Sequence, residues 1–126
     1  MLFRSLKDPA RYVGLFDIFA LSSDSEQYPI SLVEAMAAGC AVAATDVGDI
    51  RNIVTAPNRE FIVPRENETA LASAIHTLAE NASLRASIAE ANRTRAFSEY
   101  DESTMFARYQ QLYGSAMSRA DFARQD

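Results

Sequence analysis

Several residue types are scarce in this chain of 126 residues, and each scarcity excludes a class of protein. A single cysteine, Cys40, rules out an internal disulfide and suits a reducing compartment. A single histidine, His76, leaves no set of histidine and cysteine ligands for a metal site. With 12 basic against 17 acidic residues and a formal charge of -5, the chain is poorly suited to long-range attraction to nucleic acid or an anionic membrane. Any phosphate group that it recognises must be held by local geometry.

Long apolar segments are absent as well. The start, Met1 to Lys7, has too short an apolar run for a signal peptide. The longest uncharged stretch, Ala35 to Thr45, consists of small residues and is broken by Gly39, so no membrane-spanning segment is predicted. We therefore expect a cytoplasmic protein.

What the chain has in quantity is hydrophobic residues, at 48%, which rules out a disordered chain and suits one compact domain. Three short apolar runs, at 18–21, 41–44 and 61–63, are each followed by helix-type sequence. Unbroken runs of this length predict strands buried on both faces. Strands that alternate with helices predict an α/β fold with a parallel sheet. Because such sheets usually have about five or six strands, three strands predict a truncated Rossmann-like sheet.

Helix signals fill the intervals between the runs. The helix predicted over 29–38 has Pro29 at its first position and ends at Gly39, which suits the left-handed residue past a helix end. Tyr109 belongs to an apolar stripe on the last helix. The remaining predicted helices cover Asp8 to Phe16, a short segment through Val54, Thr69 to Asn81, Leu84 to Tyr100, and a last helix capped by Asp101 that carries Phe106, Tyr109, Leu112 and Tyr113.

The loop over 22–28 and the helix after it form the candidate site. In open α/β sheets, ligands bind beyond the carboxyl ends of strands, where this loop lies. The helix start should offer the unpaired backbone N–H groups of Ile30, Ser31 and Leu32, together with the positive end of the helix dipole. These groups suit a phosphate or pyrophosphate.

Two carboxylates flank this helix start. Glu34 is the only charged side chain between Glu26 and Asp46. On a helix buried on most sides, its carboxylate would need hydrogen-bond donors, such as the vicinal hydroxyls of a sugar. The pattern alone equally allows Glu34 to face solvent and Glu26 to be an exposed loop acid. Their spacing favours a shared role, because strand, loop and helix bring both carboxylates toward one crevice.

The run over 26–39, Glu26-Gln27-Tyr28-Pro29-Ile30-Ser31-Leu32-Val33-Glu34 and onward to Gly39, resembles the Glu-x7-Glu motif of family 4 (group 1) glycosyltransferases. Residues 42–48 are similar to the family's next strand and loop, and 16–23 match the strand before the motif. Downstream, 61–64 and the helices that follow agree in order and spacing. The resemblance covers about Leu2 to Met117.

This resemblance implies a GT-B fold, in which two Rossmann-like domains face each other across an active-site cleft. It also implies transfer of a hexosyl group from a nucleotide-diphosphate sugar to a sugar or lipid-linked acceptor, with retention of anomeric configuration and without a metal or cofactor. Residues 1–117 would be part of the C-terminal donor-binding domain, and 118–126 a polar tail. The family's N-terminal acceptor domain and its upstream Arg and Lys have no counterpart in this sequence. We therefore expect this chain to be inactive by itself.

By position in the motif, Glu34 would accept the ribose hydroxyls of the nucleotide, and Glu26 would lie against the donor sugar as the catalytic residue. The family often has Gly directly after the first Glu, where this chain has Gln27. The sugar hydroxyls and the distal phosphate would be covered by the backbone groups of Gln27, Tyr28, Pro29, Ile30, Ser31 and Leu32.

The same residues are compatible with a second function. A non-catalytic nucleotide-sugar-binding or interaction module would keep this site and lose only the chemistry. A dinucleotide-dependent oxidoreductase is excluded, because no Gly-x-Gly-x-x-Gly turn follows any predicted strand. An exposed sheet edge or the last helix favours self-association.

Other reactive side chains favour structural roles. His76 has no second ligand nearby in the sequence, and Cys40 at the start of a predicted strand suits a small core residue. Asp24-Ser25-Glu26 resembles an acidic metal-binding triplet, but one short loop match is a weak signal. Three arginines on the long helix are expected to face solvent: Arg85, Arg93 and Arg95.

Overall fold

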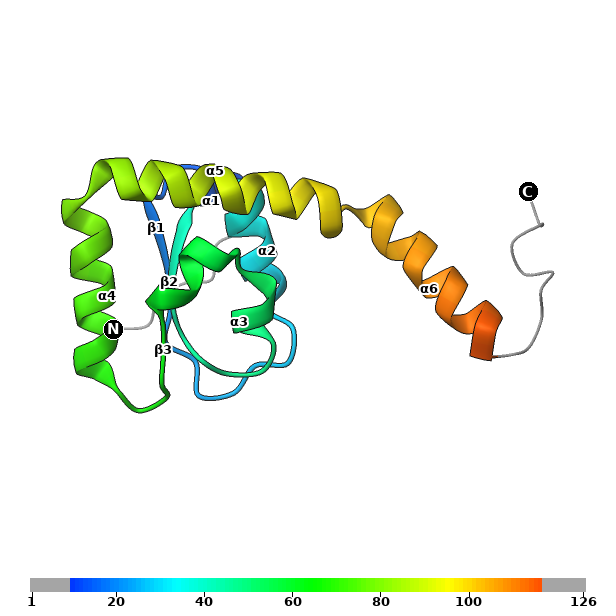
Figure 1. The fold of residues 1–126 in the computed structure, drawn as a ribbon, viewed down its shortest axis with the longest axis horizontal. Coiled ribbons are helices and arrows are strands. Elements are labelled where there is room, and N and C mark those ends of the chain that lie inside the picture. Colours follow the sequence, from blue (N-terminus) through cyan, green and yellow to red (C-terminus); the bar gives the residue numbers. More distant parts are fainter. Residues whose placement is uncertain (1–9, 117–126) are drawn as a thin grey trace.

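A computed structural model describes the backbone of residues 10–116 and the side chains of residues 11–112. Helices and strands alternate along the chain (Figure 1). In chain order they are α1 (Ala10–Val13), β1 (Ile18–Leu21), α2 (Ile30–Ala37), β2 (Ala41–Thr45), α3 (Ile50–Ile53), η1 (Ala56–Phe61, a 3-10 helix), β3 (Ile62–Val63), α4 (Glu68–Glu80), α5 (Ala82–Glu99) and α6 (Glu102–Ala116).

The three strands form one parallel sheet in the order β1-β2-β3. Ile18 pairs with Ala41 at the start of β1, and Ala44 pairs with Ile62 at the start of β3. The predicted fold class is confirmed: an α/β domain with a parallel sheet flanked by helices, consistent with a truncated Rossmann-like sheet.

Burial differs among the strands. All five side chains of β2 are buried, as predicted for a strand covered on both faces. The prediction is wrong for β1, which is only half-buried and leaves Ala20 exposed, because β1 lies at the edge of the described sheet. The third apolar run is also shorter as a strand than predicted. Phe61 ends the 3-10 helix η1, which leaves only Ile62 and Val63 in β3.

The shortness of β3 is compensated by a side chain. Asn58 lies in η1 and is fully buried. Its Oδ1 accepts from the Val42 amide at 3.0 Å, and its Nδ2 donates to the Val42 carbonyl at 2.7 Å, so the side-chain amide continues the ladder beside β2. Asn92 of α5, also fully buried, donates to Asn58 Oδ1 at 2.7 Å and to the Cys40 carbonyl at 3.1 Å. Buried polar groups are stable here because each one has a partner.

Two hydrophobic clusters cover the two faces of the sheet. Val42 and Ala44 of β2 pack with α2 and α3, whereas Ala41 and Ala43 pack with α4. The alternation follows from the two-residue period of a strand. The helix α5 contributes to both clusters, with Ala96 in the first and Ile88 in the second, and Figure 1 shows it running across the end of the domain.

The last helix, α6, extends away from the rest of the domain (Figure 1). The prediction that Asp101 caps it is supported, because its carboxylate accepts a hydrogen bond from the Ser103 hydroxyl in the first turn, and this bond is the main cause that lowers the pKa of Asp101. Phe106 and Tyr109 of the predicted stripe are 64% and 53% exposed, so the described residues cover these two side chains only in part. The side chain of Tyr113 lies outside the described residues. Within 10–116, no helix is both long and apolar enough to cross a bilayer.

Candidate functional site

The carboxyl ends of the three strands meet at one end of the sheet, because the strands are parallel. Three loops leave from there, at 22–29 after β1, 46–49 after β2 and 64–67 after β3. Figure 1 shows these loops together at the lower end of the domain. The structure therefore places the predicted loop where α/β folds bind ligands.

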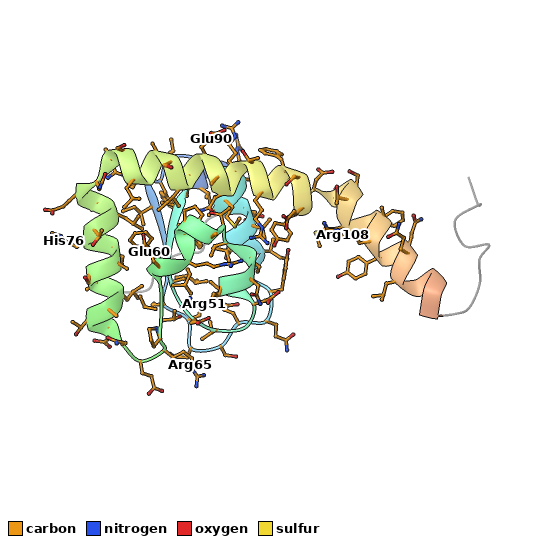
Figure 2. All side chains as sticks on the ribbon, viewed as in Figure 1. Arg51, Glu60, Arg65, His76, Glu90 and Arg108 are labelled. Atoms are coloured by element: carbon orange, nitrogen blue, oxygen red, sulfur yellow. The ribbon has the colours of Figure 1, made fainter. Side chains whose placement is uncertain are left out.

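An open pocket of about 260 Å³ lies among the three loops. It contains Glu26 from the first loop, Gly48 from the second and Arg65 from the third. Figure 2 shows Arg65 at the lower end of the molecule, among the loops. The full lining consists of Asp24, Ser25, Glu26, Asp46, Val47, Gly48 and Arg65. Arg65 is a site residue that the sequence pattern does not single out, although its position directly after a predicted strand and Pro64 is a usable signal.

Residues from all three strand ends fix the loop that carries Glu26. Ser23 Oγ donates to Glu26 Oε1 at 2.8 Å, within the loop. Thr45 Oγ1, at the end of β2, donates to the Ser23 carbonyl at 2.5 Å. Arg65 Nη1, after β3, donates to the Asp24 carbonyl at 3.2 Å. The Glu26 carboxylate is thus half-buried and held in one orientation.

The second loop touches the first at Gly48. Its φ of 55° lies in the left-handed region, which glycine adopts without strain. A methyl group at this position would overlap the Glu26 carbonyl oxygen and would lie 2.9 Å from the Gln27 carbonyl oxygen. Only glycine therefore allows the two loops to approach this closely.

Arg51 holds the second loop against β3. Its Nε lies 2.8 Å from Asp46 Oδ2, and its Nη2 donates to the Ile62 carbonyl at 2.8 Å. The Asp46 amide also donates to the Val63 carbonyl at 2.7 Å. Of the three acids that line the pocket, Asp46 therefore has a basic partner outside the lining, whereas no ion pair is recorded for Asp24 or Glu26 among the described residues.

The helix start differs from the prediction in two respects. Pro29 has extended backbone angles (φ -76°, ψ 106°), so the helix begins at Ile30 rather than at the proline. The Leu32 amide, predicted to be unpaired, donates to the Pro29 carbonyl at 3.0 Å, because the first turn tightens to an i to i−3 bond. The amides of Ile30 and Ser31 form no such backbone bond with another described residue. The helix thus offers two free amides instead of three.

Glu34 lies on α2 and is half-buried. The interpretation that this helix is buried on most sides is wrong, because its buried side chains are only Leu32, Ala35 and Met36. Within the described residues, the Glu34 carboxylate has no hydrogen bond or ion pair, and it is not among the residues that line the Glu26 pocket. It is accessible to a ligand, and its role remains a prediction.

Tyr28 links the loop to the end of α5. Its ring meets the Tyr100 ring edge to face, with centroids 6.3 Å apart, and burial is the main cause that raises the pKa of Tyr28. A second open pocket of about 260 Å³ lies beside this pair. Its lining consists of Tyr28, Glu99, Tyr100, Met105, Arg108, Tyr109 and Leu112. Of the other motif residues, Gln27, Ile30 and Ser31 are exposed, whereas Pro29 is buried.

Two residues expected to be structural, His76 and Cys40, do not line the pocket that contains Glu26. His76 is exposed on the outer side of α4, 3.4 Å from Glu80 (Figure 2). Cys40 is buried, and burial raises the pKa of its thiol, which disfavours a nucleophilic thiolate. Among the described residues, no cluster of three or more metal-ligating side chains occurs, the triplet at 24–26 included.

The prediction that three arginines face solvent is correct for one of them. Arg93 is exposed, with its guanidinium 5.9 Å from the Phe97 ring centre. Arg85 donates to the Leu78 and Ala79 carbonyls at the end of α4. Arg95 donates to the Val54 carbonyl at 2.9 Å, so it joins α5 to the end of α3. Free carbonyls at helix ends favour such contacts.

Comparison with known proteins gives two matches. Residues 1–95 match the family described as "Glycosyl transferases group 1". The chain is also similar to the N,N'-diacetylbacillosaminyl-diphospho-undecaprenol alpha-1,3-N-acetylgalactosaminyltransferase of Campylobacter jejuni, with 31% identity over 97 residues. The aligned region is 77% of this chain but 26% of the relative, so the chain spans about a quarter of that protein. No solved structure matches significantly.

Proposed function

The chain belongs to the group 1 glycosyl transferases, and from this premise we propose that it binds the nucleotide-sugar donor of a retaining, GT-B-fold hexosyltransferase. The observation that carries the proposal is the placement of Glu26 at the carboxyl ends of parallel strands, in a pocket formed by three loops. Ligands of α/β folds bind at this edge of the sheet. A sugar offers hydroxyl donors, which the fixed carboxylate of Glu26 can accept.

In this proposal Glu34 binds the nucleotide ribose. Its accessible carboxylate can accept both ribose hydroxyls, and no described residue competes for it. Hydrogen bonds to a charged group are each worth about 1.5–3 kcal/mol. Replacing Glu34 by glutamine keeps its size but removes the charge, so it should cost most of that amount.

The diphosphate is assigned to the start of α2. The Ile30 and Ser31 amides are free of backbone partners, and the positive end of the helix dipole adds to their attraction for an anion. The Leu32 amide already donates to Pro29, so it contributes less than the motif implies. Backbone groups of Gln27 and Tyr28 cover the sugar hydroxyls.

Glu26 is the proposed catalytic residue, because it would touch the donor sugar. The Ser23 hydroxyl, 2.8 Å away, keeps its carboxylate oriented. A departing nucleoside diphosphate also needs positive charge or hydrogen-bond donors for its stabilisation. Helix amides supply part of it, and we assign the rest to the upstream Arg and Lys that the resemblance implies.

The acceptor is proposed to be a sugar or a lipid-linked sugar, bound by an N-terminal acceptor domain in the cytoplasm. The Campylobacter relative's name contains both an undecaprenol diphosphate and an N-acetylgalactosaminyl group, which supports this class. Because the chain spans only 26% of that relative, we expect it to show no transfer by itself. Transfer of label from a nucleotide sugar to sugar or lipid acceptors, by this chain alone, would contradict this part of the proposal.

Binding can be tested by backbone-resolved NMR titration with UDP and with UDP-N-acetylgalactosamine. We expect millimolar affinity, which corresponds to about -4 kcal/mol, and shifts at Ile30 and Ser31. Glu34→Gln should weaken both ligands. Glu26→Gln should weaken only the nucleotide sugar. Shifts confined to other regions, for these ligands and for GDP-mannose, would refute the proposal.

A further inference from the structure

We propose that Arg65 is a positioning residue for the donor sugar, because its guanidinium holds the loop that presents Glu26. This inference rests on the proposed function of Glu26, and it adds a residue from the third loop to the site. Arg65 acts through the loop backbone, so it is not assigned a contact with the sugar.

The backbone around Arg65 is fixed on both sides. Pro64 precedes it directly after β3, and Glu66 follows with a left-handed φ of 58°. Asn67 then caps α4, with its Oδ1 accepting from the Ala70 amide at 2.9 Å. A rigid base of this kind allows one long side chain to bridge the loops. The side chain spans the strand ends and donates to the Asp24 carbonyl at 3.2 Å.

Charge in the pocket gives the same side chain a second effect. Among the described residues that line the pocket, Arg65 is the only basic one, beside Asp24, Glu26 and Asp46. Asp46 is paired with Arg51, so Arg65 is the basic residue of the lining that is left to offset the other two acids. Removing it removes the hydrogen bond to the Asp24 carbonyl and leaves Asp24 and Glu26 without a basic residue in the lining. The loop then relaxes outward, and the Glu26 carboxylate leaves the position that the sugar requires.

Arg65 is exposed, so its loss should change the stability of the fold little. A merely structural role would therefore change neither ligand's affinity. A general attraction for phosphate would change the affinities for UDP and for UDP-N-acetylgalactosamine by the same factor. A positioning role changes only the gain in affinity that the sugar brings.

The test compares the dissociation constants of UDP and UDP-N-acetylgalactosamine for the parent chain and three variants. Arg65→Ala should leave UDP binding unchanged and lower the sugar-dependent gain by about threefold to tenfold, the range for one lost hydrogen bond. Arg65→Lys should restore part of it, because a lysine keeps the charge but loses the planar fork. Arg59→Ala is the matched control, since Arg59 also donates to a backbone carbonyl, that of Arg51 at 3.1 Å, but does not line the pocket.

A double variant identifies the route of the effect. In a Glu26→Gln background, Arg65→Ala should have no further effect on sugar binding, because the group that it positions is gone. If Arg65→Ala keeps the sugar-dependent gain of the parent, or if its effect persists in full without Glu26, the inference is overturned.

A ligand-free measurement separates this inference from the proposed function. The backbone order parameter of Glu26, from amide relaxation, should fall in Arg65→Ala and stay unchanged in Arg59→Ala. If the parent bound neither nucleotide, the proposed function would fail, and the relaxation result would still decide whether Arg65 holds the loop. An unchanged order parameter would overturn the inference even if both nucleotides bind.

Discussion

Three glycines of this chain differ in ways that allow the contact between the site loops to be measured. Gly14 has no atom within 4 Å of an added methyl group, and its φ lies outside the left-handed region. Gly39 has a left-handed φ of 82° but only the Arg93 Cδ at 3.9 Å. Gly48 combines a left-handed φ of 55° with overlap onto the Glu26 carbonyl. Alanine therefore brings neither backbone strain nor overlap at Gly14, backbone strain alone at Gly39, and both backbone strain and overlap at Gly48.

The magnitudes follow from these surroundings. Gly14→Ala should change the free energy of unfolding by no more than about 0.5 kcal/mol. Gly39→Ala should cost about 1–2 kcal/mol, because alanine is strained in the left-handed region. Gly48→Ala carries the same strain and a steric overlap that adds about 1–3 kcal/mol, for a total of about 2–5 kcal/mol. The difference between Gly48→Ala and Gly39→Ala thus measures how tightly the loops are packed.

Urea denaturation followed by circular dichroism measures these free energies. NMR spectra of Gly48→Ala should also show displaced resonances at Glu26 and Gln27, and the variant should lose the sugar-dependent part of donor binding. Equal unfolding free energies for Gly48→Ala and Gly39→Ala, together with unmoved Glu26 resonances, would show that the loops do not touch closely and would refute the reasoning.

Three further predictions concern other parts of the chain. Asn58→Leu leaves the buried Val42 amide and carbonyl unpaired and should lower the free energy of unfolding by about 2–5 kcal/mol. Asn52→Leu, at an exposed site, is the control and should lower it by less than about 0.5 kcal/mol. Equal values for the two variants would contradict the role of Asn58. Because the pKa of Asp101 is lowered, its cap stabilises α6 fully above pH 3.8, the ordinary pKa, and this stabilisation is lost as the pH falls through the lower folded value. Asp101→Asn should therefore remove this part of the fall in helicity that circular dichroism records on acidification. An unchanged pH profile would count against the cap. The exposed stripe of α6 should produce a dimer or larger species by light scattering at micromolar concentration, reduced when Phe106 and Tyr109 are both replaced by serine; a monomer at all concentrations would contradict this.

Much of the fold could be predicted because its signals are local. The apolar runs located all three strands, and the proline and glycine around 29–39 located α2 to within a residue. The uniform burial of β2 and the left-handed Gly39 agree with those signals. What local pattern cannot give is a contact between distant residues. Asn58 and Asn92 are polar and yet fully buried, because they bond to each other across 34 residues, and Asn58 also bonds to Val42 of β2.

The site divides in the same way. The loop and helix around Glu26 could be predicted from the order of strand, loop and helix, whereas the role of Glu26 comes from the resemblance and stays a prediction. The residues that fix this loop could not be predicted, because Arg65 reaches the Asp24 carbonyl across 41 residues and Thr45 reaches the Ser23 carbonyl across 22. The sequence pattern also cannot show that Arg95 is bound rather than solvent-facing, since its partner at Val54 is 41 residues away. The free amides of α2 were overcounted because a tight first turn is not visible in composition.

The central claim is that Glu34 receives the ribose hydroxyls of a nucleotide. The most direct measurement compares UDP with its 2′,3′-dideoxy form, for the parent chain and for Glu34→Gln, by NMR titration. We expect the parent to bind UDP more tightly than the dideoxy form, and Glu34→Gln to bind both about equally poorly, because the hydroxyls then have no carboxylate to meet. A parent that binds both forms equally, or a Glu34→Gln variant that still prefers UDP, would contradict the ribose role of Glu34.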